Sequence, residues 1–149
     1  MTDLAIETAG FFDALADEMN AHPEQYEVLG DVELDLVLVM RRTDGGDFRV
    51  RLNFAGITCD GVAKATEEEL NLAHCWIEGP IEVWTSMFDD IVEHGRAEGR
   101  QTLNALTMGD ELQIGGVDPM GTDRVSRFNQ TLQQFLDGAG RAASVGASN

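Results

Sequence analysis

Two consecutive stretches of this chain alternate between apolar and polar positions, and they constrain its fold more than any other feature. They are residues 31–42 and residues 48–54, and their apolar positions are Val32, Leu34, Leu36, Leu38 and Met40, then Phe48, Val50, Leu52 and Phe54. A period of two is typical of strands that bury one face. The intervening positions are mostly charged, with Val37 and Val39 as exceptions, so we expect one dry and one wetter face. Because a glycine-rich segment, 43–47, separates the stretches, we predict a β-hairpin.

The register of this hairpin should keep both apolar rows on the same face. A two-residue Gly45-Gly46 loop would place Met40 opposite Arg51 and bring a charge into the core. A three-residue loop, Asp44-Gly45-Gly46, avoids this and gives the pairs Met40 with Val50, Leu38 with Leu52, and Leu36 with Phe54. We therefore expect the three-residue loop, with Gly46 in the left-handed conformation.

Helical periodicity marks other parts of the chain. Within residues 4–20, an apolar face recurs at i, i+3, i+4 and i+7: Phe12, Leu15, Ala16 and Met19. This spacing predicts an amphipathic helix. Further helices are expected from Pro80 to Gly95, at residues 103–108 and after Thr122, and further strands at 72–78 and 111–115. Residues 56–70 are expected to form the end of a strand, a loop and one acidic helical turn.

This order of elements predicts an α+β fold, and 149 residues are the size of one domain. We expect the domain to occupy residues 1–137. Residues 138–149 are small and polar, a composition that predicts a disordered tail.

The chain is strongly acidic, with 27 acidic residues, 10 basic residues and a formal net charge of −17. Lys64 is its one lysine. Such a surface repels the phosphates of nucleic acids and the anionic lipids of membranes, so neither is expected as a stable partner. No apolar run reaches the roughly 18 residues needed to cross a bilayer, and residues 1–10 lack the features of a secretory signal. We therefore expect a cytoplasmic protein.

Two groups of side chains suggest chemical sites, but each has a simpler interpretation. His74, Cys75 and Cys59 suggest zinc, yet adjacent strand residues point to opposite faces and a fourth ligand is missing. Packed, reduced cysteines and a surface histidine are favoured instead. Asp90 and His94 lie four positions apart on an expected helix, where a stabilising helix-end pair is favoured over a general base. We expect no catalytic residue, no metal and no cofactor.

The second half of the chain has a distinctive order of strands, glycines and helices. A strand ends at Ile77-Glu78-Gly79-Pro80 and leads directly into a helix that carries Trp84. A short helix, Leu103 to Met108, continues through Gly109 into Leu112-Gln113-Ile114-Gly115-Gly116, and an amphipathic helix follows. This pattern resembles the sterol carrier protein family of lipid-binding domains. Those domains also begin with a helix and a hairpin, so the resemblance extends over most of the chain.

The resemblance implies a mixed, largely antiparallel sheet of about five strands, covered on one face by helices. It also implies an apolar tunnel between sheet and helices that holds acyl chains, acyl-CoA or sterols. The residues expected to contact such a ligand are Phe54, Trp84, Met87, Phe88, Ile91, Leu103, Met108, Phe128, Leu132 and Phe135. An aromatic stripe at helical spacing is more often a packed core than a ligand site, and the sequence alone leaves both interpretations open.

Three functional hypotheses follow from these observations. The first is a non-catalytic module that binds a lipid-like or other apolar small molecule. The second is an accessory subunit of a larger enzyme assembly, whose acidic surface meets a basic protein partner. A homo-oligomer is the alternative to such a partner. The third is a small isomerase or cyclase that works on an apolar substrate with one carboxylate in its cavity.

Overall fold

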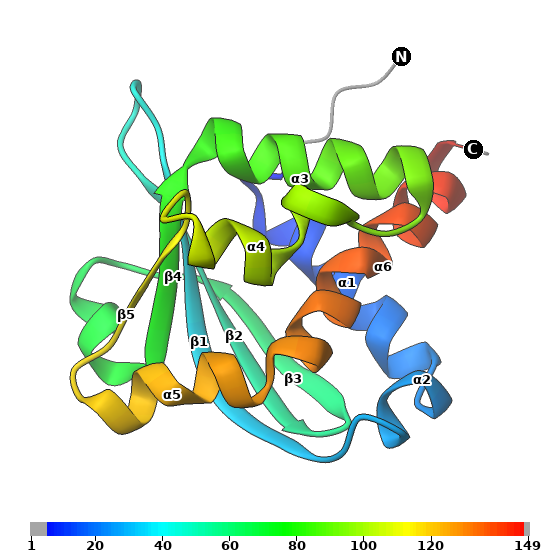
Figure 1. Ribbon diagram of the computed structural model, residues 1–149, viewed down its shortest axis with the longest axis horizontal. Coiled ribbons are helices and arrows are strands. Elements are labelled where there is room, and N and C mark those ends of the chain that lie inside the picture. The colour runs from blue at the N-terminus through cyan, green and yellow to red at the C-terminus, as the bar shows by residue number, and fades with distance from the viewer. Residues whose placement is uncertain (1–5, 148–149) are drawn as a thin grey trace.

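The protein folds into a five-stranded sheet with helices over one face (Figure 1). The structure is a computed structural model that describes the backbone of residues 6–147. The strands are β1 (Val32–Arg41), β2 (Phe48–Gly56), β3 (Thr58–Lys64), β4 (Cys75–Pro80) and β5 (Gln113–Gly115). The helices are α1 (Ala9–Ala21), α2 (Glu24–Glu27), α3 (Ile81–His94), α4 (Leu103–Met108), α5 (Pro119–Arg127) and α6 (Asn129–Ala147), with 3-10 helices η1 (Glu68–Leu72) and η2 (Gly99–Gln101). The expected α+β fold is confirmed.

Strand β1 occupies the centre of the sheet, whose strand order is β3-β2-β1-β4-β5. It pairs antiparallel with β2 and parallel with β4, while β3 and β5 add antiparallel edges. The inward rows of β1 and β2 share one hydrophobic core with residues of α1, α3, α4, α5 and α6. The sheet is therefore mixed, and its dry face is the one the helices cover.

The hairpin register differs from the prediction by two residues. Met40 lies opposite Phe48, and Leu38 lies opposite Val50, so the connection is longer than the expected three-residue loop. Gly45 and Gly46 both have positive φ, at 76° and 80°, and the Arg42 Nε donates to the Gly46 carbonyl at 2.7 Å. A shift of two residues keeps every side chain on its face, so the alternation could not distinguish the two registers.

Strand β3 was missed by the sequence pattern, which predicted a loop there. Its one buried side chain is Cys59, and most of its other residues are exposed or half-exposed. Asn20 of α1 anchors this edge, because its side-chain amide donates to the Cys59 carbonyl at 3.0 Å and accepts from the Cys59 N–H at 2.9 Å. A strand held by tertiary contacts of this kind carries little alternation of its own.

The helical stripes of the first and third α-helices face the core as predicted. Phe12, Leu15, Ala16 and Met19 of α1 are all buried. The Phe11 and Phe12 rings of α1 meet the Phe88 ring of α3 edge to face, with centroids 5.0 Å and 6.3 Å apart. Aromatic contacts of this geometry add to the stabilisation from buried area. Helix α3 ends at Gly95, whose φ of 85° suits a left-handed cap.

The outer face of the sheet is drier at its centre than the sequence predicted. Val37 and Val39 are buried against Ala73, with Leu70 of η1 packed beside them. Next to this cluster, Arg51 donates to both carboxylate oxygens of Asp35, at 2.8 Å and 2.6 Å. A bidentate pair of this kind holds the polar edge of the cluster in a defined geometry.

The C-terminal part forms two helices where the sequence pattern predicted one. Helix α5 begins at Pro119, and the Asp118 carboxylate accepts from the Gly121 N–H at 2.9 Å, so Asp118 rather than Thr122 is the cap. The chain leaves helical geometry at Phe128, with φ −105° and ψ 18°, before α6 starts at Asn129. The sequence did not predict this break, because Ser126 and Arg127 are polar and the apolar stripe continues through it.

The expected tail from residue 138 is corrected, because α6 continues to Ala147. Ala139 is fully buried, and a Cβ on Gly140 would lie 3.2 Å from the Ile91 carbonyl oxygen of α3. Ala139 and Gly140, two of the small residues that suggested disorder, instead let α6 approach α3 closely. Residues 148 and 149 of the expected tail, and residues 4 and 5 of the expected first helix, lie outside the described residues.

Cys59 on β3 and Cys75 on β4 are buried free thiols. Burial raises the pKa of each thiol to about 11. Both therefore stay protonated and unreactive near neutral pH. None of the helices within residues 6–147 combines the length and the apolar character needed to span a membrane.

The contact between α5 and the start of β4 gives a test of this fold. A Cβ on Gly121 would overlap the backbone carbonyl oxygen of His74. We expect Gly121→Ala to lower the free energy of unfolding by about 1–3 kcal/mol, because backbone cannot move aside as a flexible side chain can. Gly10→Ala in α1 is the matched control, since a Cβ there meets nothing within 4 Å. Equal stability of the two variants in urea denaturation would contradict the docking of α5.

Candidate functional site

A groove lies between residues of α4 and residues at the junction of α5 with α6. It consists of two adjoining hollows of about 440 Å³ and 450 Å³, which share Leu29, Asn104, Asn129 and Gln130. The first also contains Ser126, Arg127, Phe128 and Thr131, and the second Thr102, Gln133, Gln134 and Asp137. We refer to these lining residues together as the α4–α6 groove.

Helix α4 forms one wall of the groove and is held at its first turn. The Thr102 hydroxyl caps it by accepting from the Ala105 N–H at 3.2 Å. The Gln133 side chain of α6 accepts from the Leu103 N–H at 2.7 Å. Leu103 and Leu106 anchor the helix in the core. Helix α4 is short, so these few contacts determine its position over α6.

Asp137 closes the second hollow and links α6 to the segment that leads into α4. Its Oδ1 accepts from the Ala97 N–H and from the Gln133 side-chain amide, both at 3.0 Å. Burial raises the pKa of this carboxyl above its ordinary value of 3.8, while the two hydrogen bonds act in the opposite direction. Asp137 and Gln133 thus form a continuous polar link from α6 to both ends of the Ala97–Leu103 connection.

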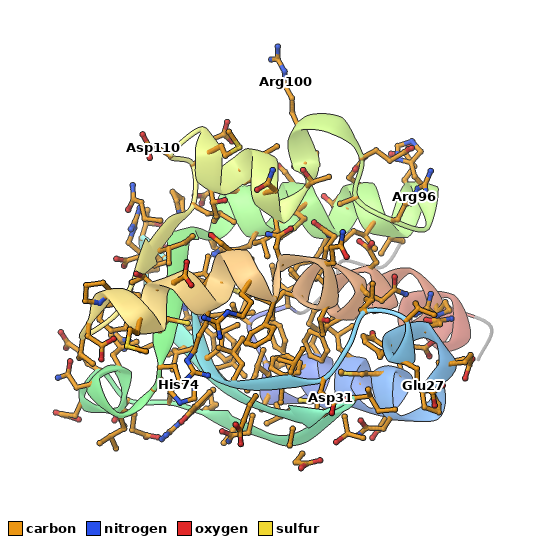
Figure 2. All side chains as sticks on the ribbon, turned by 60° about the horizontal axis from the view of Figure 1, so that its bottom comes forward. Glu27, Asp31, His74, Arg96, Arg100 and Asp110 are labelled. Atoms are coloured by element: carbon orange, nitrogen blue, oxygen red, sulfur yellow. The ribbon has the colours of Figure 1, made fainter. Side chains whose placement is uncertain are left out.

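The groove is poor in positive charge. Arg127 is its one basic residue, and the guanidinium already pairs with Asp123 at 3.3 Å and lies 5.8 Å from the centre of the Phe128 ring. Elsewhere the labelled charged side chains, such as Arg100, Asp110 and Glu27, lie at the periphery of the molecule (Figure 2). Most of the groove is lined by uncharged amides and hydroxyls, with Leu29 and Phe128 as its apolar members.

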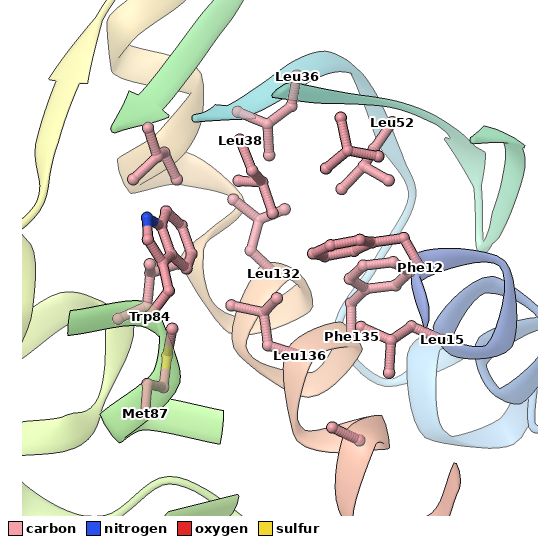
Figure 3. Close-up of a cluster of buried hydrophobic side chains, with 14 of the residues drawn as sticks. Phe12, Leu15, Leu36, Leu38, Leu52, Trp84, Met87, Leu132, Phe135 and Leu136 are labelled. Atoms are coloured by element: carbon pink, nitrogen blue, oxygen red, sulfur yellow. The ribbon is translucent and has the colours of Figure 1, made fainter. Parts of the chain in front are cut away.

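The structure places most of the predicted ligand-contacting residues in the hydrophobic core. Eight of them belong to one buried cluster and are at most 3% exposed: Phe54, Trp84, Met87, Phe88, Ile91, Leu103, Leu132 and Phe135. Figure 3 shows Trp84 and Met87 on one side of Leu132 and Leu136, with Phe12 and Phe135 on the other. The Trp84 indole N–H is satisfied by the Val39 carbonyl at 3.1 Å.

The two remaining predicted residues, Phe128 and Met108, are not among the buried residues of this cluster. Phe128 is half-buried and lines the first hollow of the groove. Met108 is 78% exposed at the end of α4. The helical spacing identified residues that face inward, but it did not identify Leu29, Asn104, Asn129, Gln130 or Thr131, which line the groove. A polar residue at a buried helical position, as at Thr131, was the one available signal.

The histidines singled out in the sequence have local structural roles. The His74 Nδ1 accepts from the Asp35 N–H at 3.0 Å, which extends the pairing between β1 and β4. His94 is exposed and bonds Asp90 at 2.8 Å, and this bond raises the His94 pKa. Asp90 also accepts from the Glu98 N–H at 2.9 Å, so the pair ties the end of α3 to the following loop. Within the described residues, no three His, Cys, Asp or Glu side chains are arranged to hold a metal ion.

The link through Asp137 gives a second test. Asp137→Ala should lower the free energy of unfolding by about 1–3 kcal/mol, because the Ala97 N–H loses its acceptor in a partly buried position. Asp137→Asn keeps an oxygen acceptor and should stay close to the unmodified protein. Urea denaturation of the two variants measures the difference.

Because the pKa of Asp137 is raised, the stabilities of Asp137→Asn and of the unmodified protein should depend differently on pH. The folded state binds a proton at Asp137 more readily than the unfolded chain, so the stability from this group falls as pH rises from 3.8 through the raised value. Relative to the unmodified protein, Asp137→Asn should therefore gain stability over that interval. A difference that is flat or of opposite sign in pH-dependent denaturation would contradict the partly buried position of the carboxylate.

The architecture of this chain is similar to that of proteins of known structure. No protein-family model matches the sequence, and no curated protein matches it significantly. The crystal structure of sterol carrier protein 2 matches with a TM-score of 0.68 and 17% identity, covering 90% of this chain and 96% of that one. A solution structure from Thermus thermophilus, of a conserved hypothetical protein described as a candidate sterol carrier protein, matches with a TM-score of 0.65 and 18% identity, covering 91% and 87%. The resemblance predicted from the sequence is confirmed at the level of the fold, which this chain shares with these sterol carrier structures.

Proposed function

We propose that this protein binds an apolar small molecule or lipid, without catalysis, and that the ligand enters at the α4–α6 groove. The observation that carries the proposal is a hollow of about 440 Å³ on the helical side of a sterol-carrier-like fold. Small-molecule sites typically enclose about 300–1,000 Å³. The groove is thus large enough for a small ligand.

The apolar part of the ligand would extend from the groove toward the core. Leu29 and Phe128 provide apolar surface at the entrance. Leu103 and Leu106 are the buried residues of α4, the helix that contributes Asn104 to the groove. A small outward shift of α4 would expose these leucines and the core residues beyond them, including the predicted contacts Leu132 and Phe135. Burial of the ligand would then contribute roughly 25 cal/mol per Å² of apolar surface, before the cost of ordering it.

Asp137 bears on the hypothesis of a small isomerase or cyclase, since its carboxylate lines the second hollow. That hypothesis requires a carboxylate free to take a proton from a substrate. The Oδ1 of Asp137 already accepts hydrogen bonds from Ala97 and Gln133, which oppose the rise in its pKa that burial causes. A carboxylate engaged in this way is suited to holding α4 and α6 together, which favours binding over catalysis.

A blocking substitution tests the groove. We expect Nile red, an uncharged apolar dye, to bind saturably with increased fluorescence. Ser126 is exposed on the first hollow, so Ser126→Trp should obstruct the entrance with little effect on folding. Its dissociation constant for the dye should rise by about tenfold or more, which corresponds to losing roughly 1.4 kcal/mol.

Val28→Trp is the matched control, because Val28 is 83% exposed and lines neither hollow. Its affinity for Nile red should stay within about twofold of the unmodified protein, a difference below roughly 0.5 kcal/mol. Fluorescence without saturation, in the unmodified protein, would reject the proposed function. Saturable binding that Ser126→Trp leaves unchanged would reject the groove as its location.

A further inference from the structure

Thr131 is a buried polar residue on the wall of the α4–α6 groove whose hydroxyl lacks a partner. The residue is 3% exposed, and its side chain forms no hydrogen bond with any group in the described part of the chain. The Thr131 oxygen is not among the fully enclosed polar atoms that lack a partner, so it is open to the hollow. A group that enters the hollow from outside can therefore form a hydrogen bond with it.

The residues before Thr131 add to this polar surface. The side-chain amides of Asn129 and Gln130 line the same hollow, and neither forms a hydrogen bond within the described residues. The wall thus offers a hydroxyl and two carboxamides. All of them are uncharged, and each can both donate and accept. Such a set matches a ligand group that also donates and accepts, such as an alcohol or an amide.

The charge of the groove disfavours an anionic ligand. Arg127, the one basic lining residue, pairs with Asp123 at 3.3 Å, and Asp137 contributes a carboxylate to the second hollow. The whole chain carries a net charge of −17, which adds long-range repulsion. A carboxylate or phosphate would lose hydration on entering, and among the described lining residues it would have to compete with Asp123 for Arg127. An uncharged polar group meets no such penalty.

We propose that the ligand of the α4–α6 groove is an uncharged lipid-like molecule, with a hydroxyl or amide head that hydrogen-bonds Thr131, Asn129 and Gln130. The groove selects against free carboxylates and phosphate esters of the same chain length. This inference rests on the proposed function, and it adds the chemical class of the ligand's polar head.

Competition between matched ligands tests the selectivity. The unmodified protein is loaded with Nile red at pH 8, and the dye is displaced with 1-dodecanol or with dodecanoate. Dodecanol should compete at about tenfold lower concentration, a difference of roughly 1.4 kcal/mol in binding. Equal or tighter binding of dodecanoate, or displacement by neither ligand, would overturn the inference while leaving the apolar site intact. Failure of the dye itself to bind would instead overturn the proposed function and this inference with it.

The hydroxyl of Thr131 is tested by an isosteric pair. Thr131→Val should weaken dodecanol binding by about three- to tenfold, the effect of one neutral hydrogen bond. Thr131→Ser keeps the hydroxyl and should restore most of the affinity. The melting temperature of Thr131→Val should change little, because the hydroxyl forms no hydrogen bond within the described residues. A valine variant that melts earlier but binds dodecanol normally would show that Thr131 has a structural role and would overturn its assignment.

Adding a charge to the groove reverses the preference. Gln130 is exposed at the entrance, so Gln130→Lys should be tolerated by the fold. We expect this variant to bind dodecanoate about fivefold or more tightly than the unmodified protein, through an ion pair at a partly desolvated site. Dodecanol binding should weaken by up to about tenfold, because the substitution removes one of the two carboxamides proposed to bond the head group. If the lysine variant leaves the ratio of the two ligands unchanged, the head group does not lie at this wall, and the proposal is wrong.

Discussion

The structure depends on burying β1 on both faces at the centre of the sheet. Val37 and Val39 on its outer face are as buried as Leu36 and Leu38 on its inner face, at 2% exposure or less. The helical layer is also attached to this strand by hydrogen bonds to its backbone. The Trp84 indole of α3 donates to the Val39 carbonyl at 3.1 Å, and Arg124 of α5 donates to the Glu33 carbonyl at 2.8 Å. Contacts with β1 thus determine the positions of the neighbouring strands and helices.

Periodicity predicted the parts of the fold in which one face is dry and the other wet. The alternation in β1 and β2 and the stripe of α1 are of this kind, and both were located correctly. It could not distinguish registers related by two residues, so Met40 was paired with Val50 rather than Phe48. Strand β3 was missed because Asn20 and the pairing with β2 hold it, not an apolar row of its own.

The candidate site was harder to predict than the fold, for a related reason. Helical spacing reports which side chains face inward, and Trp84, Phe88 and Phe135 do face inward. It carries no information on whether the space around them is filled. The groove arises where regular structure stops, at the break before Asn129 and beside the short helix α4. The residues that line the groove are mostly polar, so apolar stripes in the sequence do not identify them. Phe128 is the one residue that both lines the groove and was predicted to contact a ligand.

The distribution of regular and irregular structure explains why a ligand site would form on this side of the sheet. The outer face is braced by the Asp35–Arg51 pair and by the packing of η1, which leaves little freedom there. On the helical side, η2, α4 and the junction at Phe128 are connected to α6 through few polar contacts, chiefly Gln133 and Asp137. Segments with few anchoring contacts open at lower free energy than the core beneath them. An apolar ligand could therefore be admitted by moving α4 while the sheet and the long helices α3 and α6 keep their packing.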